Sequence, residues 1–498
     1  MVPLLASHPD VIATAGNVRE STILSSDANV AFSRQTGYNS GVLLRRPTLW
    51  LSAAALGVAG VVTAAAMIAG GHSAGTSQRD NRWRRDIAYL ARRLPQVHVN
   101  ALTGVSGQKW FAAAAQLEAR VPRLSDGQLI VGIMSLVALL RDDETVVADA
   151  VHHRPFYLLG PRFPLGLQWI GHRLYVIAAP PSHRALLGSQ LIAVSSVPVS
   201  RVVRSLRSEI DHNNSGVLAF WETQSLISAD LLSWLGVTHS LHTASYTFRT
   251  STGKRVTVRL TASRALAIPG LISRLRATFA GRVVHVRNVS VDRLILTADG
   301  SSDLAHVQLP MYQANLAVPY WMKVLAARHA VYLKYNNCLD TDGFQRLAAR
   351  ALTLLRRHPD FRLIIDLRDN PGGDTLPFQA LITGIRAHPA INRPGRIIGL
   401  VNQLTGSSAT YDAYELTSQT KAILIGQTAG DPVDDYGNSN PFLLLPGSGF
   451  GVKYSTQTFD SRKIRMGVPD IYVAPTIGQI LGGQDPVLQA ALRYSRRR

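Results

Sequence analysis

Two aliphatic segments in the last third of the chain constrain its fold most, because each ends abruptly in small and turn-forming residues. They are residues 361–373, FRLIIDLRDNPGG, and residues 399–411, GLVNQLTGSSATY. Aliphatic runs of this length predict strands, and the Gly, Asn and Pro residues mark the turns that follow them. A strand that ends in such a turn exposes a backbone amide or a serine hydroxyl. We therefore predict a serine nucleophile that faces an oxyanion site.

The surrounding region, from residue 330 to the C-terminus, alternates strand patterns with helical patterns. The strand patterns are VYLKYNN, RLIIDLR, RIIGLVNQ and AILIG, and the clearest helical segment between them is residues 341–357. Such alternation predicts an α/β layer structure in which crossover helices pack on a sheet.

The pattern is different in the first half of the chain. Residues 83–93 and the segments that follow Ser106 and Ser125 have the apolar spacing of helices, with each serine at an N-cap position. Residues 163–260 contain shorter strand patterns and a helix over residues 199–210. This arrangement resembles a PDZ-type module, which binds extended peptides at a sheet edge. An unspecialised β subdomain is the alternative.

These patterns divide the chain of 498 residues into six parts. They are a polar tail (1–42), a transmembrane anchor or uncleaved signal (43–71), a helical subdomain (72–160), a PDZ-like β-rich subdomain (161–262), a connector (263–329) and an α/β core (330–498).

A membrane span is predicted for residues 49–70, which contain no charged side chain. At about 1.5 Å per residue this segment is long enough to cross a hydrocarbon core of about 30 Å. Arg45 and Arg46 precede it and favour a cytosolic N-terminus, although further arginines follow it. The alternative is a cleaved secretory signal. Both interpretations place the main domain outside the cytoplasm, either on a single-pass anchor in the cell membrane or as a secreted or periplasmic protein.

The composition argues against several classes of function. The formal net charge is +20, but the basic residues are scattered and do not cluster as in a nucleic-acid-binding protein. We find no Cys/His cluster with metal-ligand spacing and no phosphate-binding GxxxxGK[ST] loop, so we predict no metal and no cofactor. A weaker alternative is a basic protein that binds anionic lipid through the arginines around residue 79.

The two aliphatic segments also resemble motifs of the C-terminal-processing and tricorn-type serine peptidase family, the tail-specific proteases. The family motifs are DLRxNxGG and T-x-S-S/A-A, and the similarity extends over roughly residues 84–494. The resemblance implies a crotonase/ClpP-like α/β core and a polypeptide substrate. The matching residues are Asp366, Leu367, Arg368, Asn370, Gly372 and Gly373 in the first motif and Thr405, Ser407, Ser408 and Ala409 in the second.

The resemblance assigns the nucleophile to Ser407, on which an acyl-enzyme would form. Gly372, Gly373 and the amide of Ser408 would then stabilise the oxyanion, which needs about two amide donors. Ser408 is the rival nucleophile. Taken alone, Ser407 fits an N-cap residue of the following helix better than a nucleophile, and the matching DLRDNPGG motif reverses this preference.

Two further residues are predicted to lie at the substrate site. A guanidinium binds a carboxylate through two parallel hydrogen bonds, so Arg368 either anchors a substrate carboxylate or pairs with Asp366. Tyr436 and Gly437 match a Tyr-Gly pair of the family and are expected to shape a loop near the cleft.

The general base is where this sequence departs from the family. One branch has a lysine 25 residues beyond the serine, where this chain has Pro432, and another has a histidine where this chain has Glu144. Enzymes also use carboxylates as bases, so Glu144 is the first replacement that we predict. The other side chains that could replace the base are His152, His153, Lys453 and Lys463. If no side chain replaces it, the protein is a catalytically inactive peptide-binding or scaffold protein.

Overall fold

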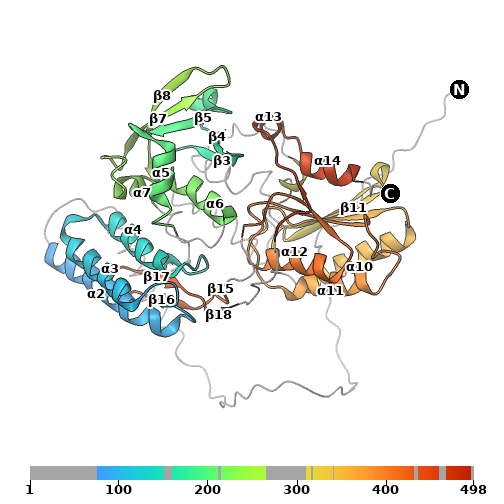
Figure 1. The fold of residues 1–498 in the computed structure, drawn as a ribbon, viewed down its shortest axis with the longest axis horizontal. Coiled ribbons are helices and arrows are strands. Elements are labelled where there is room, and N and C mark those ends of the chain that lie inside the picture. Colours follow the sequence, from blue (N-terminus) through green and yellow to red (C-terminus); the bar gives the residue numbers. More distant parts are fainter. Residues whose placement is uncertain are drawn as a thin grey trace, which may run out of the picture.

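A computed structural model describes residues 76–150, 160–210, 215–264, 310–313, 315, 318–339, 341–430, 436–458 and 467–494. Figure 1 shows three groups of elements: a helical subdomain, a β-rich subdomain and an α/β core. Within these ranges, no helix has both the length and the apolar character needed to cross a bilayer. The tail, the apolar segment 49–70 and most of the connector lie outside the described residues.

The core is a six-stranded sheet, and it confirms the predicted α/β fold class. Its first strand is antiparallel to the second, and the remaining strands are parallel. In order across the sheet the strands are β10 (Tyr320–Leu325), β11 (Ala330–Tyr335), β12 (Arg362–Asp366), β13 (Ile397–Val401), β14 (Ile423–Gly426) and β19 (Ile471–Tyr472).

Helices cover both faces of this sheet (Figure 1). Strand side chains alternate between the faces, so Leu363 and Ile365 pack with α10, α11 and α12, whereas Ile364 packs with α14. The first three helices connect successive parallel strands on one face, as right-handed crossovers require. The helices are α10 (Thr341–Arg357), α11 (Leu376–Arg386), α12 (Ser408–Gln419) and, on the other face, α14 (Pro486–Arg493), which follows the short α13 (Ile477–Leu481).

The helical subdomain contains α2 (Thr76–Val97), α3 (Gly107–Arg120) and α4 (Asp126–Val137). Both predicted N-caps are confirmed. Ser106 accepts a hydrogen bond from the amide of Lys109, and Ser125 forms a capping box with Gln128.

A segment close to the C-terminus joins this helical subdomain. The strand β1 (Val146–Asp149) pairs with β17 (Phe450–Lys453), which pairs with β16 (Phe442–Leu444). The Asp86 carboxylate of α2 accepts hydrogen bonds of 2.7 Å from the amides of Gly447 and Ser448, in the turn between β16 and β17. The sequence patterns group this segment with the core, whereas the structure pairs it with the helical subdomain (Figure 1).

The β-rich subdomain is an antiparallel sheet in the order β3 (Gly166–Ile170), β4 (Arg173–Ala178), β5 (Gln190–Val194), β7 (Thr243–Arg249) and β8 (Arg255–Thr261). The short β6 (Val197–Pro198) pairs with β5, and β2 (Pro161–Arg162) pairs with β9 (Ser263–Arg264).

Three helices accompany this sheet, and only one of them has a counterpart in the sequence patterns. The helix α5 (Val199–Leu206) ends earlier than predicted, and the helices α6 (Ser215–Ser225) and α7 (Ala229–Trp234) were not predicted. The α6 helix lies against the outer strand β3. Its Phe220 and Trp221 side chains contribute to the cleft described below.

Candidate active site

The turns that follow β12 and β13 meet at one edge of the core sheet, because parallel strands have their carboxyl ends on the same side. Two hydrogen bonds join them. Thr405 Oγ1 donates to the Leu367 carbonyl over 3.0 Å, and the Gly406 amide donates to the Asn370 carbonyl over 2.9 Å. The loop that carries the serines is therefore held against the Gly-Gly turn.

Ser407 has a backbone conformation that serine rarely adopts. It is the N-cap residue of α12, with φ of 48° and ψ of −130°. Backbone conformations of this kind cost a residue with a side chain about 1–3 kcal/mol and cluster at functional sites. The Ser407 side chain makes no capping hydrogen bond to α12. Ser407 therefore occupies the N-cap position without a capping side chain, and strain of this kind is typical of functional sites.

Gly372 and Gly373 are required by the close packing of the two turns. Their φ values are 100° and 142°. A Cβ on Gly372 would lie 2.7 Å from the Ser407 Cβ, and one on Gly373 would lie 2.7 Å from the Cys338 carbonyl oxygen. No side chain fits at either position.

The two glycine amides differ in their availability. The Gly372 amide donates to Asn370 Oδ1 over 2.9 Å, so it is already used within the turn. Among the hydrogen bonds of the described residues, none uses the amide of Gly373 or Ser408. The geometry therefore favours Gly373 and Ser408 as an oxyanion pair and does not support the assignment of Gly372.

The Ser408 hydroxyl has a structural partner. Its Oγ donates to the Gly373 carbonyl over 2.8 Å. This bond ties the first residue of α12 to the Gly-Gly turn. It favours Ser407 over Ser408 as the nucleophile.

A buried polar cluster lies behind these turns. Cys338 Sγ is 3.6 Å from Asn370 Nδ2 and 3.5 Å from Asp412 Oδ2 on α12. Burial raises the pKa of the Asp412 carboxyl and of the Cys338 thiol well above their usual ranges. The Cys338 thiol donates to Asp412 Oδ2, and burial favours the neutral form of both groups.

We expect the Asp412→Asn variant to gain stability relative to the native protein as the pH rises above about 4. An unfolded aspartate releases its proton above about pH 4, whereas the folded protein retains it, so Asp412 lowers the free energy of unfolding as the pH rises. Asparagine does not titrate and keeps a side-chain oxygen that accepts from the Cys338 thiol. Urea unfolding of both proteins at several pH values measures the difference, and a difference that does not change with pH would contradict the assignment.

A cleft with a volume of about 430 Å³ lies where the three groups of elements meet, and Ser407 is part of its wall. The structure thus brings Ser407, Glu144 and Arg368 to one cavity, as the sequence predicted. The wall also contains charged and aromatic residues from all three groups: Asp143 from the helical subdomain, Trp169, Phe220 and Trp221 from the β-rich subdomain, and Tyr312, Asp369 and Asp485 from the core and its flanking segments.

Glu144 lies on the turn between α4 and β1. Its amide donates to Asp142 Oδ1 over 3.0 Å, and its Oε2 accepts a hydrogen bond of 2.8 Å from the Ser439 hydroxyl. Lys453, an alternative base, lies in β17 and is not part of the cleft wall. The other alternative bases, His152, His153 and Lys463, lie outside the described residues. So does Pro432, the position at which one branch of the family has a lysine.

A buried His98–Asp142 pair, which the sequence patterns did not reveal, supports the turn that carries Glu144. His98 Nε2 lies 2.7 Å from Asp142 Oδ2, and both side chains are fully buried. The Asn100 amide donates to His98 Nδ1, so Nε2 carries the ring proton and donates to Asp142. Because both ring nitrogens are engaged, His98 positions this turn and does not act as the base for Ser407.

Tyr436 in β15 (Tyr436–Gly437), which pairs with β18 (Gln457–Thr458), packs on this histidine. The ring centroids of Tyr436 and His98 are 5.4 Å apart. Tyr436 does not contribute to the described cleft wall. Its position therefore agrees with the predicted loop-shaping role and gives no support to substrate contact.

Arg368 is paired with carboxylates of the protein, which agrees with the structural alternative for this residue. Its side chain is 3% exposed and forms ion pairs with Asp366 and Asp485. Its two terminal nitrogens each donate to Asp485 over 2.8 Å, and Cζ lies 3.8 Å from the ring centroid of Tyr312. The guanidinium is therefore already engaged, which favours the predicted pairing with Asp366 over a substrate-binding role.

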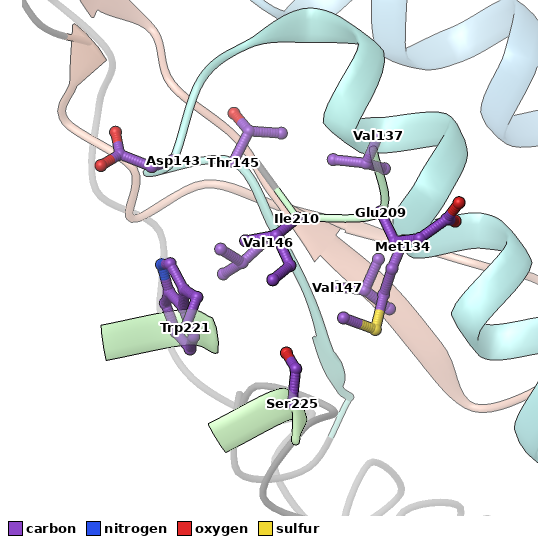
Figure 2. Close-up of a pocket in the computed structure, with 10 residues that line it drawn as sticks. All are labelled: Met134, Val137, Asp143, Thr145, Val146, Val147, Glu209, Ile210, Trp221 and Ser225. Carbon is purple, nitrogen blue, oxygen red and sulfur yellow. The ribbon is translucent and has the colours of Figure 1, made fainter. Parts of the chain in front are cut away.

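A smaller cavity, of about 60 Å³, lies beside the cleft and is mainly apolar. Asp143 and Trp221 contribute to the walls of both cavities. Figure 2 shows these two side chains on the same side of the small cavity, with Val146 and Val147 farther along it. The Asp143 carboxylate and the Trp221 indole ring therefore both lie at the boundary between the two cavities.

Several solved structures are similar to this chain, and mature CPAF is among them. Mature CPAF is similar over 84% of this chain and 97% of its own, with 13% identity and a TM-score of 0.54. This chain has the CPAF peptidase fold. The photosystem II D1 C-terminal processing protease (14% identity, 80% of this chain and 97% of that chain, TM-score 0.34) and the tricorn protease (11% identity, 83% and 36%, TM-score 0.34) are similar more distantly.

At the level of sequence, no family model and no curated protein matches this chain. The likeness to mature CPAF confirms the predicted serine-peptidase fold, with its helical and β-rich parts. At 13% identity it shows the fold alone, so the roles of individual residues depend on the geometry described above.

Proposed function

We propose that this protein is a serine endopeptidase that cleaves polypeptides through an acyl-enzyme on Ser407. The observation that carries this proposal is the strained conformation of Ser407, φ 48° and ψ −130°, at the start of α12. Strain of this kind persists where the surrounding structure enforces it, which is typical of active sites. Because segment 49–70 has no charged side chain and is long enough to cross a bilayer, we further propose that the enzyme acts outside the cytoplasm, either exported or anchored in the membrane.

In the proposed reaction, Ser407 Oγ attacks the carbonyl carbon of the scissile peptide bond while Glu144 accepts its proton. The negative oxygen of the tetrahedral intermediate lies at the amides of Gly373 and Ser408, where the N-terminal dipole of α12 adds a favourable field. Glu144 returns the proton to the departing amine. Water then hydrolyses the ester by the same steps in reverse order.

The alternative is a catalytically inactive member of the same fold that binds peptides or acts as a scaffold. One observation favours it: the Glu144 carboxylate is already engaged by the Ser439 hydroxyl. In addition, Pro432 stands where one branch of the family has its lysine. The cleft and its aromatic side chains would serve peptide binding equally well.

The test is covalent labelling by a fluorophosphonate probe, followed by mass mapping of the modified peptide. We expect an adduct on Ser407 in the native protein, none at this site in Ser407→Ala, and a retained adduct in Ser408→Ala. Glu144→Gln should slow labelling by at least about 10²-fold, the typical contribution of a general base.

Folded native protein that stays unlabelled across about pH 5 to 9 would support the binding protein instead. An adduct on Ser408 would overturn the assignment of the nucleophile. Normal labelling of Glu144→Gln would overturn the assignment of the base and direct attention to His152 and His153.

A further inference from the structure

Carboxylates outnumber cations on the described part of the cleft wall. Asp143, Glu144, Asp369 and Asp485 lie there together with a single guanidinium, that of Arg368. The described wall therefore carries a net of three negative charges at neutral pH. This is the opposite sign to the whole chain, whose formal net charge is +20.

The single cation of this described wall is committed within the protein. Both terminal nitrogens of Arg368 donate to Asp485, and the guanidinium also pairs with Asp366. On this described wall, a free C-terminal carboxylate would find no available guanidinium and would meet like charges. Like charges brought together across an interface oppose binding.

Aromatic side chains form the wall on the side of the β-rich subdomain. They are Trp169 from β3 and Phe220 and Trp221 from α6. Such rings bury large apolar side chains, and their faces also attract a lysine or arginine within about 6 Å. Because Trp221 and Asp143 line the same two cavities and lie on the same side of the small one (Figure 2), one ligand side chain can meet a carboxylate and an aromatic ring together.

We propose that the cleft recognises an internal polypeptide segment in which a lysine or arginine lies beside a large apolar residue. It selects against acidic segments and gains nothing from a free C-terminus. This proposal rests on the proposed function, for which it names the class of substrate.

Binding to the full chain with the Ser407→Ala substitution tests the proposal without any need for turnover. The probe is a fluorescein-labelled peptide of the sequence type Gly-Leu-Lys-Phe-Gly, blocked at both ends, and binding is followed by fluorescence anisotropy. Its analogue with Glu in place of Lys should bind at least about five-fold more weakly. The lysine peptide with a free C-terminal carboxylate should bind no better than the blocked one. Raising the salt from about 50 mM to about 500 mM should weaken only the lysine peptide.

Variants connect this preference to the cleft. Asp143→Asn and Asp369→Asn, made separately, should each reduce the difference between the lysine and glutamate peptides. Asp342→Asn removes an exposed carboxylate of α10 that lies away from the described cleft wall, so it should change nothing. Equal affinity for both blocked peptides, or tighter binding of the free carboxylate, would overturn the proposal.

The two proposals fail separately. The fluorophosphonate probe is small and uncharged at its reactive end, so labelling of Ser407 depends on the activation of the serine and not on the charge of the wall. Labelling without peptide preference would retain the enzyme and reject this specificity. Peptide preference without labelling would retain the specificity and support the binding protein.

Discussion

Ser407→Gly is expected to raise the free energy of unfolding by about 1 kcal/mol and to lower peptide hydrolysis by at least about 10³-fold. Serine holds φ of 48° and ψ of −130° at this position, at a cost of about 1–3 kcal/mol. Glycine adopts this conformation without strain, but its greater freedom in the unfolded chain offsets about 0.5–1 kcal/mol of the gain. Urea unfolding and hydrolysis of a fluorogenic peptide measure the two effects.

Ser407→Ala is the matched control for this prediction. Alanine also lacks the hydroxyl, so it should be as inactive as glycine, but it keeps the Cβ and therefore the strain. Glycine should thus be more stable than alanine at this position. Equal stability of the two variants would mean that the conformation of Ser407 stores no strain, and the main argument for its function would be lost.

The core could be predicted from the sequence because its signals are local. Each strand is a short aliphatic run followed by turn residues, and the helix predicted over residues 341–357 is found with the same bounds. Ser106 and Ser125 cap their helices as the spacing of polar and apolar residues indicates. Ser407 could be identified because both turns follow their strands directly in the sequence.

The remaining parts of the site depend on contacts between distant segments. His98 and Asp142 are 44 positions apart, and Ser439 meets Glu144 across 295 positions. No local pattern marks such pairs. The unpredicted α6 brings Phe220 and Trp221 to the cleft through its packing on β3, which its own low amphipathic character does not reveal. The second partner of Arg368 was missed for the same reason, since Asp485 lies 117 positions away.

Arg368→Ala is expected to lower the free energy of unfolding by about 3–5 kcal/mol, because it leaves Asp366 and Asp485 without their cation. Burial raises the pKa of Asp366, but the Arg368 guanidinium and the Lys334 ammonium outweigh this effect and hold the pKa below its ordinary value. Asp366 is fully buried, so its charge cannot be screened by water once Arg368 is removed. Urea unfolding near neutral pH measures the loss, and Arg356→Ala, an exposed arginine of α10, should change stability by at most about 0.5 kcal/mol.

The Asp366–Arg368 pair also predicts how the stability loss of Arg368→Ala depends on pH. A carboxyl group whose pKa is lowered by folding contributes stability above its ordinary pKa of about 4, and this contribution disappears as the pH falls through the lowered value. The native protein should therefore lose stability below about pH 4, and the deficit of Arg368→Ala should shrink over the same range. If Arg368 instead served mainly to bind substrate, its removal would weaken peptide binding and leave unfolding nearly unchanged at every pH. The comparison thus separates a structural ion pair from a substrate anchor by a measurement that requires no catalytic activity.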